Sequence, residues 1–207
     1  MTHEQPVVGS YGWKGGEAQC SQEYIAPALI VTLKRLKVHR VLDLGCGNGA
    51  LTRALAEAGF DVLGCDADRE GIEHAKIAGG KFTVASVYDD PAKLGHKDFD
   101  AVVSAEVVEH LFSPRQLPTF AAAVLKPHGY LIVTTPYHGY LKNLVLSLFN
   151  KWGTHADPFW EGGHIKLFSR KTLTRLLEEG GFDVVSFQGL GRFPLLWKSM
   201  LLVARVR

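Results

Sequence analysis

The stretch "VLDLGCGNG", Val41 to Gly49, decides the fold of this chain. Its first half is apolar except for Asp43 and is typical of a buried strand, while its second half is a glycine-rich turn. The turn opens onto "ALTRALAEAG", which has helical spacing. Glycines let the backbone approach a ligand closely, and the N-terminus of a helix offers N–H groups without intrahelical partners. This order of elements predicts a ligand site at the edge of a parallel α/β sheet.

The remaining chain repeats the alternation of strand and helix. Strand-like segments lie at 40–45, 60–66, 82–86, 99–106 and 129–136, and helical ones at 22–37, 49–59, 68–79, 113–127 and 169–181. The helix at 113–127 is expected to open on Ser113 as its cap. Two final strands, "FDVVSFQG" and "SMLLVARV", have only a loop between them, which favours an antiparallel pair. We therefore predict an open parallel sheet, covered by helices on both faces and closed by an antiparallel hairpin.

Length and composition indicate one globular domain, 1–207, with ordinary proportions. The chain is 46% hydrophobic and 21% charged, and its net charge of +2 does not by itself predict a nucleic-acid partner. Three cysteines without a CxxC pair suit a reducing compartment, and neither a signal peptide nor an 18-residue apolar run is evident, so we expect a cytoplasmic protein. Residues 1–37 are interpreted as an N-terminal cap segment and 137–163 as a lid insert.

Asp43 narrows the choice of ligand. A carboxylate two residues before Gly45 would repel a pyrophosphate but would attract a cationic group. Asp66 ends the next strand, where it could accept hydrogen bonds from ribose hydroxyls. The relaxed dinucleotide pattern Gly45-x-Gly47-x-x-Ala50 is also present, so a nicotinamide-dependent reductase remains an alternative, disfavoured by Asp43 and by the terminal hairpin.

Taken together, "VLDLGCGNG", Asp66 and "LKPHGYLIVTTP" resemble the class I S-adenosylmethionine (SAM)-dependent methyltransferases over roughly residues 38–207. The resemblance implies a Rossmann-like α/β fold, with a seven-stranded sheet in the order 3-2-1-4-5-7-6 and strand seven antiparallel. It places Asp43, Gly45 and Gly47 at the methionine end of the cofactor, Asp66 at the ribose, and Ser86 and Val87 beside the adenine. The full set of implied cofactor contacts is Asp43, Gly45, Cys46, Gly47, Asp66, Ala67, Ser86, Val87 and Glu106.

A second stretch, "SAEVVEHLF", carries two glutamates and a histidine directly after a predicted strand. On a helical turn, residues i, i+3 and i+4 share a face, so Glu106, Glu109 and His110 are expected to converge. Two carboxylates and an imidazole suit Mg²⁺, Mn²⁺ or Zn²⁺. His164, in the glycine-flanked "WEGGHIKLFS", is the candidate for a fourth ligand.

The segments "EVVEHL" and "GGHIKLFS" resemble those of the ubiquinone-pathway O-methyltransferases and of the small-RNA 2′-O-methyltransferases. In the latter family two glutamates and two histidines hold a catalytic metal, which implies Glu106, Glu109, His110 and His164 as ligands here. Two other roles remain open. His110 could act as a general base without a metal, with His164 as a secondary candidate, or the turn could be purely structural.

The insert adds an amphipathic segment, "LKNLVLSLFNKW" at 141–152, whose apolar residues share one helical face. We expect a helix packed on the domain as a lid, with a hydrophobic wall for a lipophilic acceptor or a peripheral membrane contact as alternatives. His138 and His155 are interpreted as loop histidines. Tyr11 and Trp13 are expected to cover the cofactor crevice.

These observations predict a SAM-dependent O-methyltransferase acting on a small aromatic or lipophilic hydroxyl compound, quinol-like or catechol-like, with a divalent cation as a candidate second cofactor. An Asn/Asp-Pro-Pro-Tyr signature of amino-group methyltransferases is absent from the sequence, which favours oxygen as the acceptor atom. A small-RNA 2′-O-methyltransferase and a non-catalytic SAM-binding protein are the alternatives. The near-neutral charge disfavours nucleic acid.

Overall fold

The computed structural model describes residues 21–155, 159 and 163–207. Most of the N-terminal cap segment, including Tyr11 and Trp13, lies outside the described residues, as does most of the loop 156–162. The expectation that this segment covers a cofactor therefore stays a prediction.

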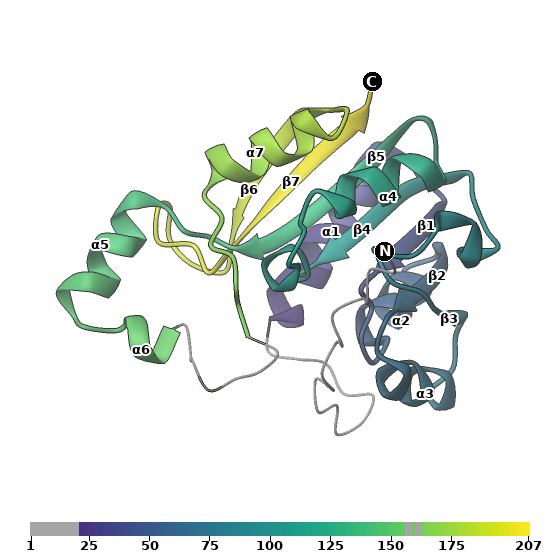
Figure 1. Cartoon of the computed structure of the whole chain (residues 1–207), viewed down its shortest axis with the longest axis horizontal. Coiled ribbons are helices and arrows are strands. Elements are labelled where there is room, and N and C mark those ends of the chain that lie inside the picture. Colours follow the sequence, from purple (N-terminus) through teal and green to yellow (C-terminus); the bar gives the residue numbers. More distant parts are fainter. Residues whose placement is uncertain (1–20, 156–158, 160–162) are drawn as a thin grey trace, which may run out of the picture.

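One seven-stranded sheet forms the centre of the molecule, with strand order β3-β2-β1-β4-β5-β7-β6 (Figure 1). The first five strands run parallel, and β7 is antiparallel to both of its neighbours. The strands are β1 (Arg40–Leu44), β2 (Asp61–Asp66), β3 (Phe82–Val84), β4 (Phe99–Ala105), β5 (Leu125–Pro136), β6 (Phe182–Leu190) and β7 (Ser199–Val206). The predicted fold class, strand order and terminal hairpin are confirmed.

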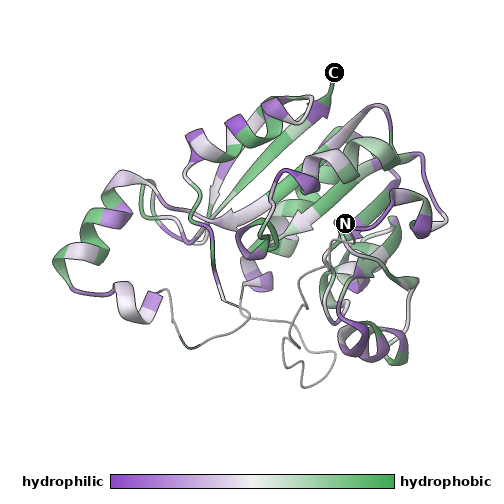
Figure 2. Ribbon diagram, viewed as in Figure 1, coloured by the Kyte–Doolittle hydropathy of each residue, from purple (hydrophilic) through white to green (hydrophobic). Residues whose placement is uncertain are grey.

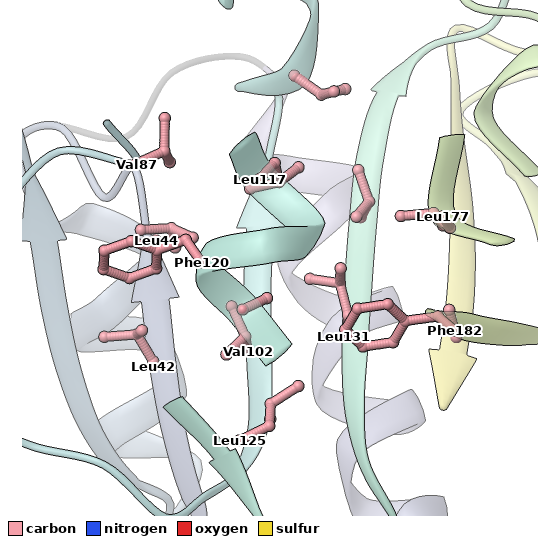
Figure 3. Close-up of a cluster of buried hydrophobic side chains, with 14 of the residues drawn as sticks. Leu42, Leu44, Val87, Val102, Leu117, Phe120, Leu125, Leu131, Leu177 and Phe182 are labelled. Carbon is pink, nitrogen blue, oxygen red and sulfur yellow. The ribbon is translucent and has the colours of Figure 1, made fainter. Parts of the chain in front are cut away.

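Helices cover both faces of the sheet because residues of alternate parity in the central strands point to opposite sides. On one face Val41 and Val103 pack against α1 and α2, and on the other Leu42 and Val102 pack toward α4 and α7. Figure 3 shows the second cluster, in which Leu117 and Phe120 of α4 lie over the strands. The helices on the sheet are α1 (Gln22–Leu36), α2 (Ala50–Glu57), α3 (Arg69–Ile77), α4 (Gln116–Val124) and α7 (Arg170–Glu179).

The start of α4 differs from the prediction. The helix begins at Gln116 with Arg115 at the N-cap position, where no side chain caps it, and Ser113 lies in the turn before it. The Ser113 backbone N–H instead donates to the Tyr88 hydroxyl at 3.2 Å. The helix also ends earlier than expected, because Leu125 already adopts an extended conformation and begins β5.

The insert is two short helices rather than one. Helix α5 (Tyr140–Leu148) ends before Asn150, which has a left-handed φ of 50°, and α6 (Trp152–His155) follows. Helix α5 has no fully buried residue, but Lys142 is half-buried and its ammonium donates to the Lys198 carbonyl at 3.3 Å, and the role of the helix as a lid stays a prediction. Figure 1 shows α5 and α6 lying to one side of the helix and sheet layers. Among the described residues, no helix is long and apolar enough to cross a bilayer.

Candidate active site

A cavity of about 350 Å³ opens at the carboxyl ends of the parallel strands. Ligands of open α/β sheets bind at this edge, where the order of strands reverses between β1 and β4. The cavity is lined by every residue that the sequence predicts as a cofactor contact: Asp43, Gly45, Cys46, Gly47, Asp66, Ala67, Ser86, Val87 and Glu106. Helix α1 and the segment before it contribute Ser21, Gln22 and Ile25, which the sequence alone did not single out.

The glycine turn has the left-handed backbone that the sequence suggests. Gly45 and Gly47 have φ values of 85° and 53°, which residues with a side chain adopt only at a cost. A Cβ atom at Gly45 would lie 2.4 Å from a methyl group of Val107. The turn therefore approaches the segment after β4 so closely that position 45 accepts only glycine, and this contact forms one wall of the cavity.

Asp43 is buried beneath this turn, at 1% exposure. Its Oδ2 accepts a 2.6 Å hydrogen bond from the Thr52 hydroxyl of α2, and its Oδ1 has no hydrogen-bond partner among the described residues. Burial raises the pKa of Asp43 to about 7, and the nearby Asp66 contributes in the same direction, whereas the Thr52 hydrogen bond lowers it. An orphaned carboxylate oxygen at a cavity wall is suited to a cationic ligand group.

Asp66 ends β2 and holds the turn and the next helix together. Its Oδ2 accepts the Gly47 N–H at 2.8 Å, and its Oδ1 accepts the Asp68 N–H at 2.9 Å. Burial raises the pKa of this carboxyl, while the backbone N–H donors lower it. Each carboxylate oxygen can accept a second hydrogen bond, so Asp66 can both order the loop and bind a pair of ligand hydroxyls.

Glu106 lies where β4 ends, in a left-handed conformation with a φ of 56°. Its Oε1 accepts from the Thr134 hydroxyl at 3.0 Å and its Oε2 from the Ser199 hydroxyl at 3.2 Å. The Ser199 oxygen lies 3.2 Å from the Tyr24 hydroxyl, which extends the network to α1. Burial raises the pKa of Glu106 to about 7, while the two hydroxyl donors and the positive charge of Lys142 lower it.

Glu109, His110 and His164 form a second cluster beside Glu106. Their candidate ligand atoms lie within 4.8 Å of one another. The Glu109 Oε2 accepts from the Thr135 hydroxyl at 2.9 Å, and its buried Oε1, which lies 4.0 Å from His110 Nε2, has no hydrogen-bond partner among the described residues. Burial, and then the neighbouring Glu106, raise the pKa of Glu109 well above its usual range.

The two imidazoles of this cluster are oriented by the loop before α7. His110 Nδ1 lies 3.1 Å from the Gly163 carbonyl, an arrangement that assigns the proton to Nδ1 and the lone pair to Nε2. The His110 and His164 rings meet edge to face with centroids 5.0 Å apart. Burial and the nearby His110 lower the pKa of His164 to about 4, which keeps this ring neutral at pH 7.

The sequence predicts that Glu106, Glu109 and His110 converge, and this prediction is wrong for Glu106. The chain leaves β4 through the left-handed Glu106 and then forms only a short 3-10 turn, Val108–His110. Because this is not an α-helical turn, the i, i+3, i+4 rule does not apply to it. Glu106 therefore binds Thr134 and Ser199, while Glu109 and His110 meet His164 across the loop.

His138 lies in the loop between β5 and α5, as the sequence interpretation has it, but it is buried, whereas His155 is the last residue of α6 and not a loop histidine. His138 is 5% exposed and its ring packs near His155 and Trp152, with centroid distances of 5.2 Å and 6.1 Å.

Sequence analysis did not identify Ser199 as a site residue, although the predicted direction of its strand could have located it. The last strand is antiparallel, so its first residue lies at the carboxyl edge of the parallel strands, where Ser199 pairs with Pro136.

Comparison with known proteins identifies the family of the chain. Residues 19–187 match a sequence family described as a methyltransferase domain. Ubiquinone biosynthesis O-methyltransferases are similar: that of Ruegeria sp. (strain TM1040) is 30% identical over 168 residues, covering 77% of this chain and 66% of the relative. The same enzyme of Sinorhizobium fredii (strain NBRC 101917 / NGR234) is 32% identical over 172 residues, with coverage of 77% and 66%. The chain thus spans about two thirds of the length of these relatives.

Solved structures share the fold. Magnesium protoporphyrin IX methyltransferase of Synechocystis PCC 6803, with bound S-adenosylhomocysteine (SAH), superposes with a TM-score of 0.66 at 21% identity, covering 90% of this chain and 84% of that one. The methyltransferase in the Haloferax volcanii complex with the Trm112 activator gives a TM-score of 0.68 at 20% identity, covering 90% and 91%. The family match and the named relatives define a SAM-dependent methyltransferase. The chain belongs to the methyltransferase domain family.

Proposed function

We propose that this methyltransferase transfers the methyl group of SAM to a hydroxyl of a small aromatic or lipophilic acceptor, quinol-like or catechol-like. One observation carries the proposal. His110, Glu106 and His164 line the same cavity as the glycine turn, so a proton acceptor stands next to the predicted cofactor site. The names of the relatives, ubiquinone biosynthesis O-methyltransferases, support oxygen as the acceptor atom.

In this proposal the chain's residues have separate roles. Asp43 faces the positive end of the cofactor, and Asp66 binds the ribose. The acceptor oxygen forms a bond to the methyl carbon while the carbon–sulfur bond breaks, leaving SAH. The hydroxyl proton moves to Nε2 of His110, whose Nδ1–H is held by the Gly163 carbonyl. Alignment of oxygen, carbon and sulfur is the main contribution that the cavity can make.

A divalent cation is the alternative to His110 as the base, because Nε2 of His110 cannot bind a metal and accept the hydroxyl proton at the same time. Glu109, His110 and His164 fit such an ion, since Glu109 Oε1 is buried without a partner and a backbone carbonyl orients His110, as is usual for metal-ligating histidines. Glu106 is engaged by Thr134 and Ser199 and is not part of this three-residue group. A bound Mg²⁺, Mn²⁺ or Zn²⁺ would lower the pKa of the acceptor hydroxyl.

The exposed apolar residues of α5 support a peripheral membrane contact through residues 141–152, or a contact with a lipophilic acceptor. Leu148 and Phe149 are 72% and 68% exposed, and Figure 2 shows hydrophobic residues along α5. Co-sedimentation with phosphatidylglycerol vesicles tests the membrane contact. Leu148→Glu should abolish it while Val31→Glu, at an exposed site on α1, should not. Equal binding by both variants would contradict the proposal.

The decisive experiment is a methyl-transfer screen over catechols, phenols, quinols and short RNA, with and without EDTA and added Mg²⁺ or Mn²⁺. Activity that EDTA does not change would end the metal proposal, and activity on RNA alone would favour the 2′-O-methyltransferase. His110→Asn should lower kcat at least a hundredfold. His96→Asn is the matched control, because His96 is exposed before β4, at the opposite edge of the sheet. SAH binding without turnover on any acceptor would favour the non-catalytic alternative.

The proposal also places the protein in the cytoplasm. Cys46 and Cys65 are free, buried thiols, and burial raises the pKa of both. Neutral buried thiols are structural rather than reactive, and their free state suits a reducing compartment. Expression of a fluorescent fusion followed by fractionation into cytosol, membrane and periplasm would test this placement.

A further inference from the structure

Positive charge collects beside Glu106, on the side of the site formed by the β6–β7 loop and α5. Lys142 lies on α5, Arg192 lies in the loop between β6 and β7, and Lys198 directly precedes β7. The Lys142 ammonium donates to the Lys198 carbonyl at 3.3 Å, and the Lys198 ammonium lies 5.3 Å from the centre of the Tyr24 ring. The β6–β7 loop runs next to the start of α5 in Figure 1.

These cations have no acidic partner within ion-pair distance in the described parts of the chain. The seven ion pairs found there, each within 4.0 Å, involve neither Lys142 nor Arg192 nor Lys198. Glu106 is the one carboxylate near enough to influence Lys142, and its two oxygens already accept from hydroxyls. Three exposed lysines do form ion pairs, and Lys81 with Asp61 at 2.6 Å is one of them.

Lys142 is the informative member because it is half-buried. Burial and the nearby Arg192 lower its pKa to about 8, and Glu106 acts in the opposite direction. The side chain is therefore still mostly protonated at pH 7. A partly desolvated ammonium without a counter-ion destabilises the folded protein, and such an arrangement is expected where a ligand supplies the missing negative charge.

Two buried imidazole nitrogens adjoin the same lysine. His138 Nε2 and His155 Nε2 have no hydrogen-bond partner among the described residues, and His138 is more than nine-tenths buried. Burial, and then the positive charge of Lys142, lower the pKa of both rings, in His138 to about 4. His138 Nδ1 lies 3.4 Å from Asn143 Oδ1, which leaves the lone pair on Nε2 to accept a hydrogen bond from a hydroxyl.

From this arrangement we propose that the methyl acceptor carries an acidic group, a carboxylate or a phosphate, which Lys142 and Arg192 bind beside Glu106 while the buried histidines bind its hydroxyl groups. This inference deepens the proposed O-methyltransferase function and rests on it. Glu106 lines the cofactor cavity and is also near enough to Lys142 to influence its charge, so the acidic group is placed on the side of Glu106 that faces Lys142.

Matched acceptors that differ only in charge provide the test. Wild-type enzyme is assayed with 3,4-dihydroxybenzoate against 3,4-dihydroxybenzamide, and with 3,4-dihydroxybenzylphosphonate to separate phosphate from carboxylate recognition. The anionic acceptors should have a kcat/KM about tenfold above that of the amide, the size of one or two charge-assisted hydrogen bonds. In Lys142→Gln and Arg192→Gln this ratio should fall to near one, and Lys142→Arg should restore most of it.

The matched control is Lys151→Gln, at an exposed position just after α5, which should leave the ratio unchanged. Calorimetric titration of each probe into the SAH complex supplies a readout that needs no turnover. Lys142-dependent binding of the anionic probes without methyl transfer would support the inference and remove the proposed function. A wild type that binds or turns over the amide as well as the anions, a ratio unchanged in Lys142→Gln, or an equal loss in Lys151→Gln would overturn the inference. So would failure of every anionic probe to bind.

Discussion

The variant Asp43→Asn tests two effects of this carboxyl: its effect on the stability of the protein and its effect on the affinity for the cofactor. The folded carboxyl titrates near 7 because it is buried, against an ordinary value of 3.8 in the unfolded chain. Between these two values the folded state holds a proton that the unfolded state has lost, so the free energy of unfolding falls as the pH rises. Below about 3.8 the contribution of Asp43 is fully present, and above about 7 it is gone.

The size of the effect follows from the two pKa values. A carboxyl that titrates near 7 instead of 3.8 costs the folded protein about 4 kcal/mol at high pH, and about 3 kcal/mol of this develops between pH 5 and pH 8. Asp43→Asn does not ionise. The wild type should therefore lose about 3 kcal/mol more than the variant over this range. Glu106 and Glu109 have raised pKa values too, but they titrate in both proteins and cancel in the comparison.

Urea unfolding of the ligand-free proteins at pH 5 and pH 8 measures this difference, and calorimetry with SAM measures its functional counterpart. Asp43→Asn should bind SAM at least tenfold more weakly at pH 8, since the variant has lost the charge that, in the proposed site, faces the sulfonium or the ammonium group. Parallel loss of stability with pH in both proteins would refute the reasoning about burial. Undiminished affinity for SAM in the variant would refute the assignment of Asp43 to the cofactor.

Three further substitutions test neighbouring contacts. Gly45→Ala should lower the free energy of unfolding by about 2 kcal/mol or more, seen by thermal denaturation, since its Cβ would overlap a neighbouring valine and its φ is positive; unchanged stability would contradict the close approach. Thr52→Val removes a hydrogen bond from Asp43 and should move the pH midpoint of SAM binding upward, and a downward shift would be inconsistent with it. Ser199→Ala should likewise raise the pKa of Glu106 and shift the acidic limb of kcat/KM to higher pH, whereas an unchanged profile would show that Glu106 does not control it.

The sheet and the cofactor cavity are predictable from sequence because their determinants are local. Alternation of strand and helix limits the connections, and a final pair of strands without a helix must be antiparallel. Glycines at 45 and 47 indicate the tight turn, and Asp66 follows from its place at the end of β2. Strand ends of one parallel sheet share an edge, so the segments that follow β1, β2, β3 and β4 had to meet.

The acceptor side is different, because its contacts join residues far apart in the chain. Glu106 meets Ser199, 93 positions away, and His110 meets Gly163, 53 positions away. No periodic pattern in the sequence predicts either of these two contacts. The left-handed conformation of Glu106 is also not predictable from the sequence, since a non-glycine residue adopts it only where tertiary contacts compensate its energetic cost. Helical spacing therefore predicted a convergence that the 3-10 turn does not produce.

The raised pKa of Asp43 has a consequence for turnover. Near pH 7 a substantial fraction of this carboxyl is protonated in the empty cavity, and a cationic ligand must drive that proton off. SAM carries the sulfonium charge and SAH does not, so binding of SAM should release more protons than binding of SAH. Calorimetry at pH 7 in two buffers of different ionisation enthalpy counts the protons, and Asp43→Asn should remove the difference between the ligands. Equal proton release would show that the carboxyl does not respond to the sulfur. If the difference is present, Asp43 becomes protonated again once methyl transfer has converted the sulfonium of SAM into the neutral thioether of SAH. The affinity for SAH is then lower than the affinity for SAM, which favours exchange of the product for fresh cofactor.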